Sequence, residues 1–259
     1  SLDHVDYDKE HKHSGVNDMT LQIRSGEIVG IAGVDGNGQT QLAQLITGVI
    51  VPQGGKIYLK DRSVAVFDPH SFITDGVSHV PEDRNAQGLV GDMSIAENLV
   101  LKETDSPKFS RGKGLRLNKR AIHDYAEEMV QKYDVRCTSV GQTVRSLSGG
   151  NQQKVIIGRW LLTEPDVLLL DEPTRGIDVG AKYEIYQLIL DLANKGKTVI
   201  MVSSEMPELL GVCDRILVMS GGRLAGEVDA KTATQEDIMR LAAKYVSVSY
   251  THLRAHETK

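Results

Sequence analysis

Leu147-Ser148-Gly149-Gly150-Asn151-Gln152-Gln153 and, a short way further along, Leu168-Leu169-Leu170-Asp171-Glu172-Pro173 are the two stretches that decide the fold of this chain. The first predicts a tight turn that opens a helix, and the free backbone N–H groups of a helix start favour a bound phosphate. The second predicts a buried strand that ends in two adjacent carboxylates, and α/β sheets hold their ligands at the carboxyl ends of their strands. Together, in this order, the two stretches indicate an α/β protein with a phosphate site.

The composition is that of a globular protein of one or two compact lobes. The chain has 259 residues, of which 40% are apolar and 25% charged, and its net charge is −5. The pI of about 5.9 excludes a global basic field that would recruit nucleic acid or anionic lipid. Two cysteines are too few for a disulfide framework, which is typical of a reducing cytoplasm. The apolar runs are too short to span a bilayer.

We expect one α/β domain over residues 1–246, with a helical insertion over about 92–163. After the insertion, strand-length apolar segments alternate with helical patterns, which argues for a largely parallel sheet with crossover helices. Capping boxes at Ser94–Glu97 and Thr234–Asp237 predict two helix starts. Residues 247–259 continue no pattern, and we expect them to be a non-native tail outside the fold.

A glycine-rich loop lies between an apolar strand and a helical segment. Gly33–Thr40 matches the G-x-x-x-x-G-K-[ST] phosphate loop except that Gln39 stands where the pattern has lysine. Loss of that charge costs on the order of 2–5 kcal/mol of polyphosphate binding, so weak binding and inefficient hydrolysis are expected. The residues of this segment predicted to bind a nucleotide are Gly33, Asp35, Gly36, Asn37, Gly38, Gln39, Thr40 and Gln41.

These motifs resemble those of the ATP-binding cassette (ABC) ATPases, and the resemblance covers nearly the whole chain. It implies the P-loop NTPase fold of an ABC cassette, with a mainly parallel sheet and a helical subdomain. ATP and Mg²⁺ are the implied cofactors, and the implied activity is ATP hydrolysis. By the same resemblance Thr40 and Asp171 would hold Mg²⁺, and Glu172 would polarise the attacking water as general base. An exposed acidic turn after a strand is the alternative interpretation of the two carboxylates.

Two more positions depart from the family pattern. The stretch Val80–Arg84 lies where the family has its glutamine loop, and Glu82 takes the place of the glutamine. Glu205 lies where the family's switch histidine would reach the γ-phosphate, so an anion replaces a hydrogen-bond donor. With Gln39, these two substitutions predict a degenerate nucleotide site.

The family's cassettes work as head-to-tail pairs in which each ATP lies between the phosphate loop of one cassette and the signature of the other. The resemblance therefore implies that the signature of this chain completes a partner's site, and that Arg175–Asp178 is the loop that faces the partner. A degenerate site beside a well-formed signature is typical of the second, C-terminal cassette of tandem import ATPases, so the start at Ser1 is expected to reflect a lost first cassette. The signature residues are Ser148, Gly149, Gly150, Asn151 and Gln152.

The two halves of the chain resemble different importers. Residues 30–134 resemble the second cassette of nucleoside importers, and residues 147–245 that of galactose, methylgalactoside and ribose importers. A chimeric sequence and a natural sequence of mixed character both account for this difference.

Our interpretation is the ATP-binding subunit of a simple-sugar importer, peripheral at the cytoplasmic face of the plasma membrane. It would act with a first cassette, a transmembrane permease and, indirectly, a solute-binding protein, and without nucleic acid. The alternatives are the same role in a nucleoside importer, a catalytically silent scaffold cassette, and a non-transport ABC ATPase.

Overall fold

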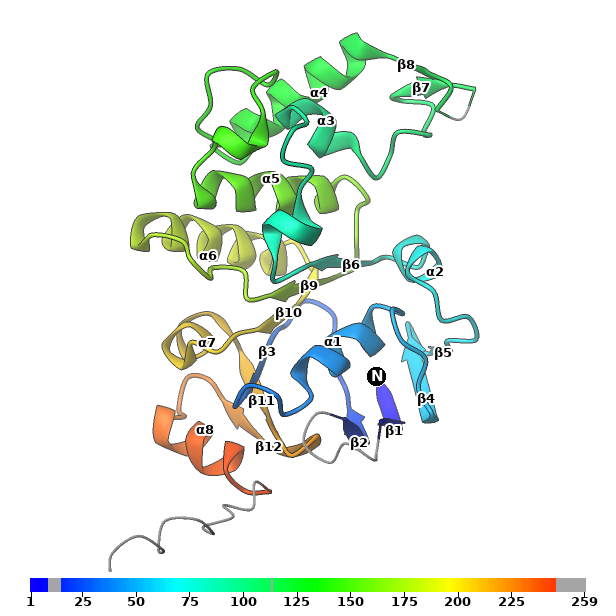
Figure 1. Cartoon of the computed structure of the whole chain (residues 1–259). Helices are drawn as coiled ribbons and strands as arrows, with labels where there is room; N and C mark the ends of the chain where they lie inside the picture. The colour runs from blue at the N-terminus through cyan, green and yellow to red at the C-terminus, as the bar shows by residue number, and fades with distance from the viewer. Residues whose placement is uncertain (9–14, 113, 246–259) are drawn as a thin grey trace, which may run out of the picture.

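The computed structural model describes residues 1–8, 15–112 and 114–245, and its centre is a six-stranded sheet (Figure 1). The strand order is β12-β11-β3-β10-β9-β6, and all neighbours pair in parallel except β12, which is antiparallel to β11. This arrangement confirms the predicted α/β class with a mainly parallel sheet. The strands are β3 (Ile28–Gly33), β6 (Val77–Val80), β9 (Val167–Asp171), β10 (Thr198–Val202), β11 (Arg215–Ser220) and β12 (Arg223–Asp229).

A second, antiparallel sheet of four strands covers one face of the central sheet together with helix α1 (Gln39–Ile46). Side chains alternate along a strand, so Val29 and Ile31 of β3 lie in the core on this face, with Leu42 of α1. The motifs in the sequence do not predict this sheet. Its order is β2-β1-β4-β5, with β1 (Leu2–Tyr7), β2 (Val16–Leu21), β4 (Gly54–Leu59) and β5 (Arg62–Ser63).

Helices cover the opposite face of the central sheet, against alternate strand residues such as Ile28 and Leu168. The capping box of Thr234 with Asp237 opens the last of these helices and is confirmed. Residues 246–259, and with them the expected tail, lie outside the described part of the chain. The covering helices are α6 (Val179–Asn194), α7 (Met206–Val212) and α8 (Gln235–Ala242).

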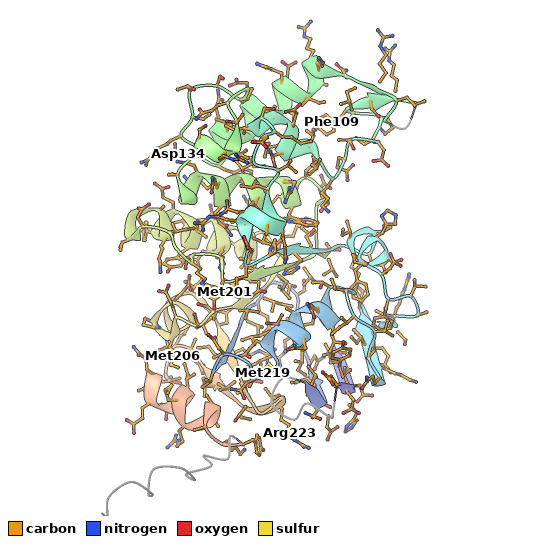
Figure 2. All side chains as sticks on the ribbon, in the orientation of Figure 1. Phe109, Asp134, Met201, Met206, Met219 and Arg223 are labelled. Atoms are coloured by element: carbon orange, nitrogen blue, oxygen red, sulfur yellow. The ribbon has the colours of Figure 1, made fainter. Side chains whose placement is uncertain are left out.

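Between β6 and β9 the chain forms a mainly helical part, at the top of Figure 1. Its core includes Phe109, labelled in this part of the molecule in Figure 2. The Phe109 ring meets the Tyr125 ring edge-on, at 5.3 Å between centroids. The capping box of Ser94 with Glu97 opens α3, which confirms the predicted helix start. The elements are η1 (Arg84–Gly88), α3 (Ile95–Val100), β7 (Ser110–Arg111), β8 (Arg116–Leu117), α4 (Lys119–Lys132), η2 (Val144–Ser146) and α5 (Gly149–Leu161); α2 (Pro69–Thr74) precedes β6.

In the described part of the chain, no helix combines the length and the apolar character that a bilayer crossing requires.

Candidate nucleotide site

The register of the parallel strands gathers most of the predicted site residues at one edge of the sheet. Val202 of β10 pairs with Ile31 of β3 on one side and with Asp171 of β9 on the other, and Val80 of β6 pairs with Leu170. The carboxyl ends of these four strands therefore share an edge. The glycine-rich loop, Glu82, Asp171 at the end of β9 with Glu172 after it, and Glu205 lie at or directly after these ends.

The glycine-rich loop is shaped by hydrogen bonds that converge on one carbonyl. The Val34 carbonyl accepts bonds from Asn37 N at 3.2 Å, Asn37 Nδ2 at 2.9 Å and Gln39 Nε2 at 3.0 Å. Asn37 is buried, and its Oδ1 accepts a bond from Gly221 N at 2.8 Å, which ties the loop to the turn between β11 and β12. Gly38 takes the left-handed conformation, with φ of 96°, at the start of α1. The Asn37 side chain therefore shapes the loop.

Gln39, the residue that replaces the lysine, folds back over its own loop. A Cβ atom on Gly33 would lie 2.4 Å from Gln39 Nε2, so the absence of a side chain at Gly33 makes room for the amide. Asp35, Gly36 and Thr40 are exposed and Gln41 is half-buried. The exposed Thr40 hydroxyl follows directly on the loop, in reach of solvent and of a ligand.

The two carboxylates at the end of β9, Asp171 and Glu172, lie in different surroundings. Burial, assisted by the charge of Glu172, raises the pKa of Asp171 to about 6. Burial also raises the pKa of Glu172, although its Oε1 accepts a bond of 2.7 Å from Ser204 N, which acts in the opposite direction. Glu172 adopts a left-handed backbone conformation with φ of 46°, which is uncommon for a residue with a side chain. Perturbed acids at a strand end are a feature of functional sites.

Mg²⁺ fits the oxygen donors at this edge. Within the described residues no cation pairs with Asp171, and its carboxylate is the kind of ligand that Mg²⁺ prefers. Thr40 offers a hydroxyl from the start of α1. Bound there with a nucleotide, Mg²⁺ would supply positive charge against the phosphates.

Glu82 and Glu205, the two acids that depart from the family pattern, are paired with bases from the same chain. Glu205 lies 2.5 Å from Lys182 Nζ of α6, and Glu82 forms an ion pair with Arg175. The motifs did not predict these bases, because each pair joins residues far apart in the sequence. The pairing neutralises both carboxylates, so neither acts as an isolated anion at this edge.

The signature residues lie at the start of α5, away from the phosphate loop. In Figure 1, α5 and α1 are well separated, so this chain does not bring its signature to its own loop. Ser148 is exposed at the N-cap, and its Oγ accepts a bond of 2.8 Å from Asn151 Nδ2. Gln152 is buried and donates to the Val144 carbonyl at 3.1 Å, so its side chain supports the turn. The groups open to a ligand are those of Ser148 and Gly149.

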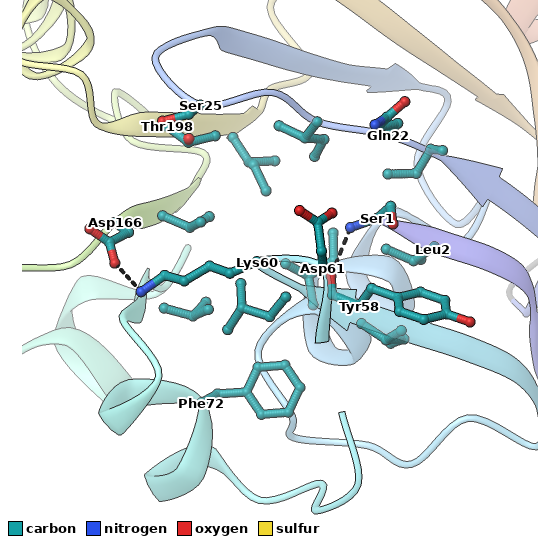
Figure 3. Close-up of a pocket in the computed structure, with 18 of the residues that line it drawn as sticks. Ser1, Leu2, Gln22, Ser25, Tyr58, Lys60, Asp61, Phe72, Asp166 and Thr198 are labelled. Carbon is teal, nitrogen blue, oxygen red and sulfur yellow. Dashed lines mark hydrogen bonds and ion pairs between the residues drawn. The ribbon is translucent and has the colours of Figure 1, made fainter. Parts of the chain in front are cut away.

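A cavity of about 500 Å³ lies at the opposite edge of the sheet (Figure 3). Its walls include Val77, Val167 and Thr198, the first residues of β6, β9 and β10. An ion pair between Lys60 and Asp166 lies beside it. The cavity thus lies at the amino ends of these strands, whereas α/β sheets bind ligands at the carboxyl ends. It is therefore separate from the candidate nucleotide site.

The fold and the site define the class of ATP-binding cassettes, whose members hydrolyse ATP. A profile of that family, described as ABC transporter, matches residues 16–175. The chain belongs to the ABC transporter family, and the resemblance seen in the motifs is confirmed.

Curated relatives and solved structures are consistent with this assignment. Ribose import ATP-binding protein RbsA of Corynebacterium glutamicum is 47% identical over 240 residues, which are 93% of this chain and 45% of that protein. Galactose/methyl galactoside import ATP-binding protein MglA 2 of Photobacterium profundum is 46% identical over 231 residues, which are 89% of this chain and 45% of that protein. The chain thus spans about half the length of the curated relatives it matches.

Among solved structures, a nucleotide-free ATP-binding cassette from an ABC transporter has a TM-score of 0.76 at 21% identity and covers 94% of each chain. A dimeric cassette with ADP and Pi has a TM-score of 0.72 at 23% identity, covering 90% of this chain and 99% of that one. Both show the fold alone.

Proposed function

We propose that this chain is an ATP-binding cassette of an importer for simple sugars and that it serves as the second cassette of a pair. The relatives named for ribose and galactose import support the sugar class, because they align with about nine-tenths of the chain. The aligned part includes residues 30–134, which resemble nucleoside importers, as well as residues 147–245, which resemble sugar importers. A permease, a first cassette and, indirectly, a solute-binding protein are its partners in this proposal, at the cytoplasmic face of the plasma membrane.

The observation that supports the second-cassette role is the contrast between the exposed signature and the chain's own nucleotide site at the sheet edge. Ser148 is exposed at the start of α5, so the signature is open to a partner. At the sheet edge, Gln39 is turned onto its own loop and Glu205 is held by Lys182. A chain built this way completes a partner's ATP site and contributes little hydrolysis of its own.

The residues that we propose to bind this chain's own nucleotide are those predicted from the loop. Backbone N–H groups of the loop and the start of α1 would hold the phosphates, with Thr40 and Asp171 on Mg²⁺. Glu172, anchored by Ser204 N, is placed to orient water. Without the lysine charge, this binding is weak.

Steady-state ATP hydrolysis tests the proposal. We expect little turnover from the chain alone, and, when it is mixed with a lysine-bearing first cassette, turnover above the rate of that cassette by itself. Ser148→Arg is expected to abolish this gain, because a long charged side chain fills the space of the partner's phosphate. A gain that survives Ser148→Arg would exclude a shared site. Robust turnover by the chain alone would show that it is an independent ATPase, and no gain in the mixture would favour a silent scaffold.

Nucleoside import is the second candidate, because Pro81–Arg84 resembles that group of importers. Co-purification with permeases of the two classes separates the candidates. Binding to the sugar permease and not to the nucleoside permease supports the first proposal, and the reverse result supports the second.

A further inference from the structure

Arg84 lies between the signature turn at the start of α5 and the loop of residues 174–178, called the loop 174–178 below. It is the first residue of η1, after β6, and its Nη1 donates to the Arg175 carbonyl at 2.7 Å. Its Nη2 donates to the Gly176 carbonyl at 3.4 Å, in the loop that follows the carboxylates of β9. A Cβ atom on Gly149 would lie 3.0 Å from the same Nη2. The guanidinium therefore fills the space between the signature and the loop 174–178.

The segment that carries Arg84 is capped at its start and attached to α5 at its end. The Asp83 side chain accepts bonds from the first N–H groups of η1, at 3.0 and 2.9 Å. At the other end of η1, Arg159 of α5 donates to the Gly88 carbonyl, and a Cβ on Gly88 would lie 2.8 Å from Ile156 Cδ1. The last residue of η1 is thus attached to α5, and Arg84, at the first residue, extends from η1 toward the loop 174–178.

A second contact strengthens the attachment to this loop. Glu82, two residues before Arg84, pairs with the Arg175 side chain, while Arg84 takes the Arg175 carbonyl. Among the residues that the structure describes, no carboxylate forms an ion pair with Arg84. Its charged hydrogen bonds go to backbone carbonyls only, for which the rigid, forked guanidinium is better suited than a lysine.

We propose that Arg84 is a positioning residue that locks the signature start of α5 to the loop 174–178, so that the two present one surface to the partner's ATP. This inference rests on the proposed function, because it assumes that the signature serves a partner's site. Arg84 touches backbone on both sides, so it acts through the placement of Ser148 and Gly149. Its loss leaves the signature residues in the chain and removes both the bonds to the loop 174–178 and the guanidinium that lies beside Gly149.

The test is ATP turnover of the chain mixed with a lysine-bearing first cassette. For Arg84→Ala we expect kcat to fall at least tenfold with KM for ATP within twofold, because the partner's own loop still binds the nucleotide. Arg84→Lys is expected to recover only part of the loss, since a single ammonium does not reach both carbonyls in the same geometry. A kcat for Arg84→Ala within twofold of the parent chain would overturn the inference.

Arg215→Ala is the matched control. Arg215, the first residue of β11, is also half-buried, and β11 lies far from α5 (Figure 1). It forms ion pairs with Glu27 at 2.7 Å and with Glu227 of β12 at 2.8 Å. It is expected to lower the melting temperature and leave kcat per folded molecule unchanged. An equal loss of kcat in this variant would show that stability, and not placement of the signature, limits turnover.

Two further readouts separate this inference from the function on which it rests. Ser148→Arg in the same mixture tests the shared site, so full turnover in that variant refutes the proposed function itself. Loss of turnover with Ser148→Arg but not with Arg84→Ala refutes only the positioning role. In the chain alone, Arg84→Ala is expected to speed amide hydrogen exchange in both 149–153 and 174–178, and unchanged exchange in either segment would contradict a lock.

Discussion

Replacing Gln39 with lysine puts a positive charge at the start of α1, where the phosphate-loop pattern has one. A hydrogen-bonded charge pair withdrawn from water is worth on the order of 2–5 kcal/mol. In the free loop, the new ammonium is expected to take over the bond that Gln39 makes to the Val34 carbonyl at 3.0 Å. Releasing that bond for the nucleotide costs about 1 kcal/mol. The net gain of about 1–4 kcal/mol corresponds to ATP affinity roughly 5- to 900-fold tighter.

Calorimetric titration of the chain with Mg-ATP at near-physiological salt measures this change as Kd. The matched control is Gln41→Lys, which adds the same charge two residues further along α1 and is expected to change Kd less than threefold. A change below threefold for Gln39→Lys would refute the assignment of this loop to phosphate. An equal gain from both variants would show that net charge alone, and not the loop geometry, attracts the nucleotide.

Three further predictions concern this chain's own nucleotide site and its stability. Glu172→Gln, in the mixture with a first cassette, is expected to change turnover less than twofold, and a tenfold loss would show that this chain's own site is a full contributor. Burial lowers the pKa of His79 from 6.5 to about 4, so the unfolded chain binds a proton that the folded chain rejects between these values. Protonation of His79 in the unfolded chain therefore lowers the free energy of unfolding as pH falls from 6.5 toward 4, and the loss between pH 7.5 and pH 5 is about 2 kcal/mol. Urea melts of His79→Leu at the two pH values are expected to show a smaller difference than the parent chain, and an identical difference would contradict the assignment. Asn37→Ala leaves the Gly221 N–H without its buried acceptor and is expected to cost about 2–3 kcal/mol, or roughly 5–10 °C in Tm by calorimetry; a shift below 2 °C would contradict the role of Asn37.

The motifs predicted the parts of the fold that depend on local sequence. Capping boxes such as that of Ser94 act over three residues, and the glycine-rich loop and the Asp171 strand are contiguous patterns, so all were visible in the sequence. The pairing of Glu82 with Arg175 joins residues 93 positions apart and exists only because β6 and β9 are neighbours. No local signal encodes such a pair, and the same is true of Lys182 with Glu205.

The antiparallel sheet escaped prediction for a different reason. Its strands β1 and β2 carry acidic residues such as Asp6 and Asp18, and their pairing contains register shifts. Strict alternation of apolar and polar residues, on which strand prediction depends, is interrupted at such shifts. The buried residues Val5, Val16 and Met19 show which face meets the core only once the pairing is known.

The two bonds from Asn37 to the Val34 carbonyl and the bond from Gly221 N to Asn37 Oδ1 hold the curve of the loop without help from the side chain at position 39. Two properties of a phosphate loop are thereby separated: its shape is a property of the backbone and of Asn37, and its charge is a property of position 39. In this chain a change at position 39 therefore alters the charge offered to a phosphate, while the bonds of Asn37 keep the shape of the loop.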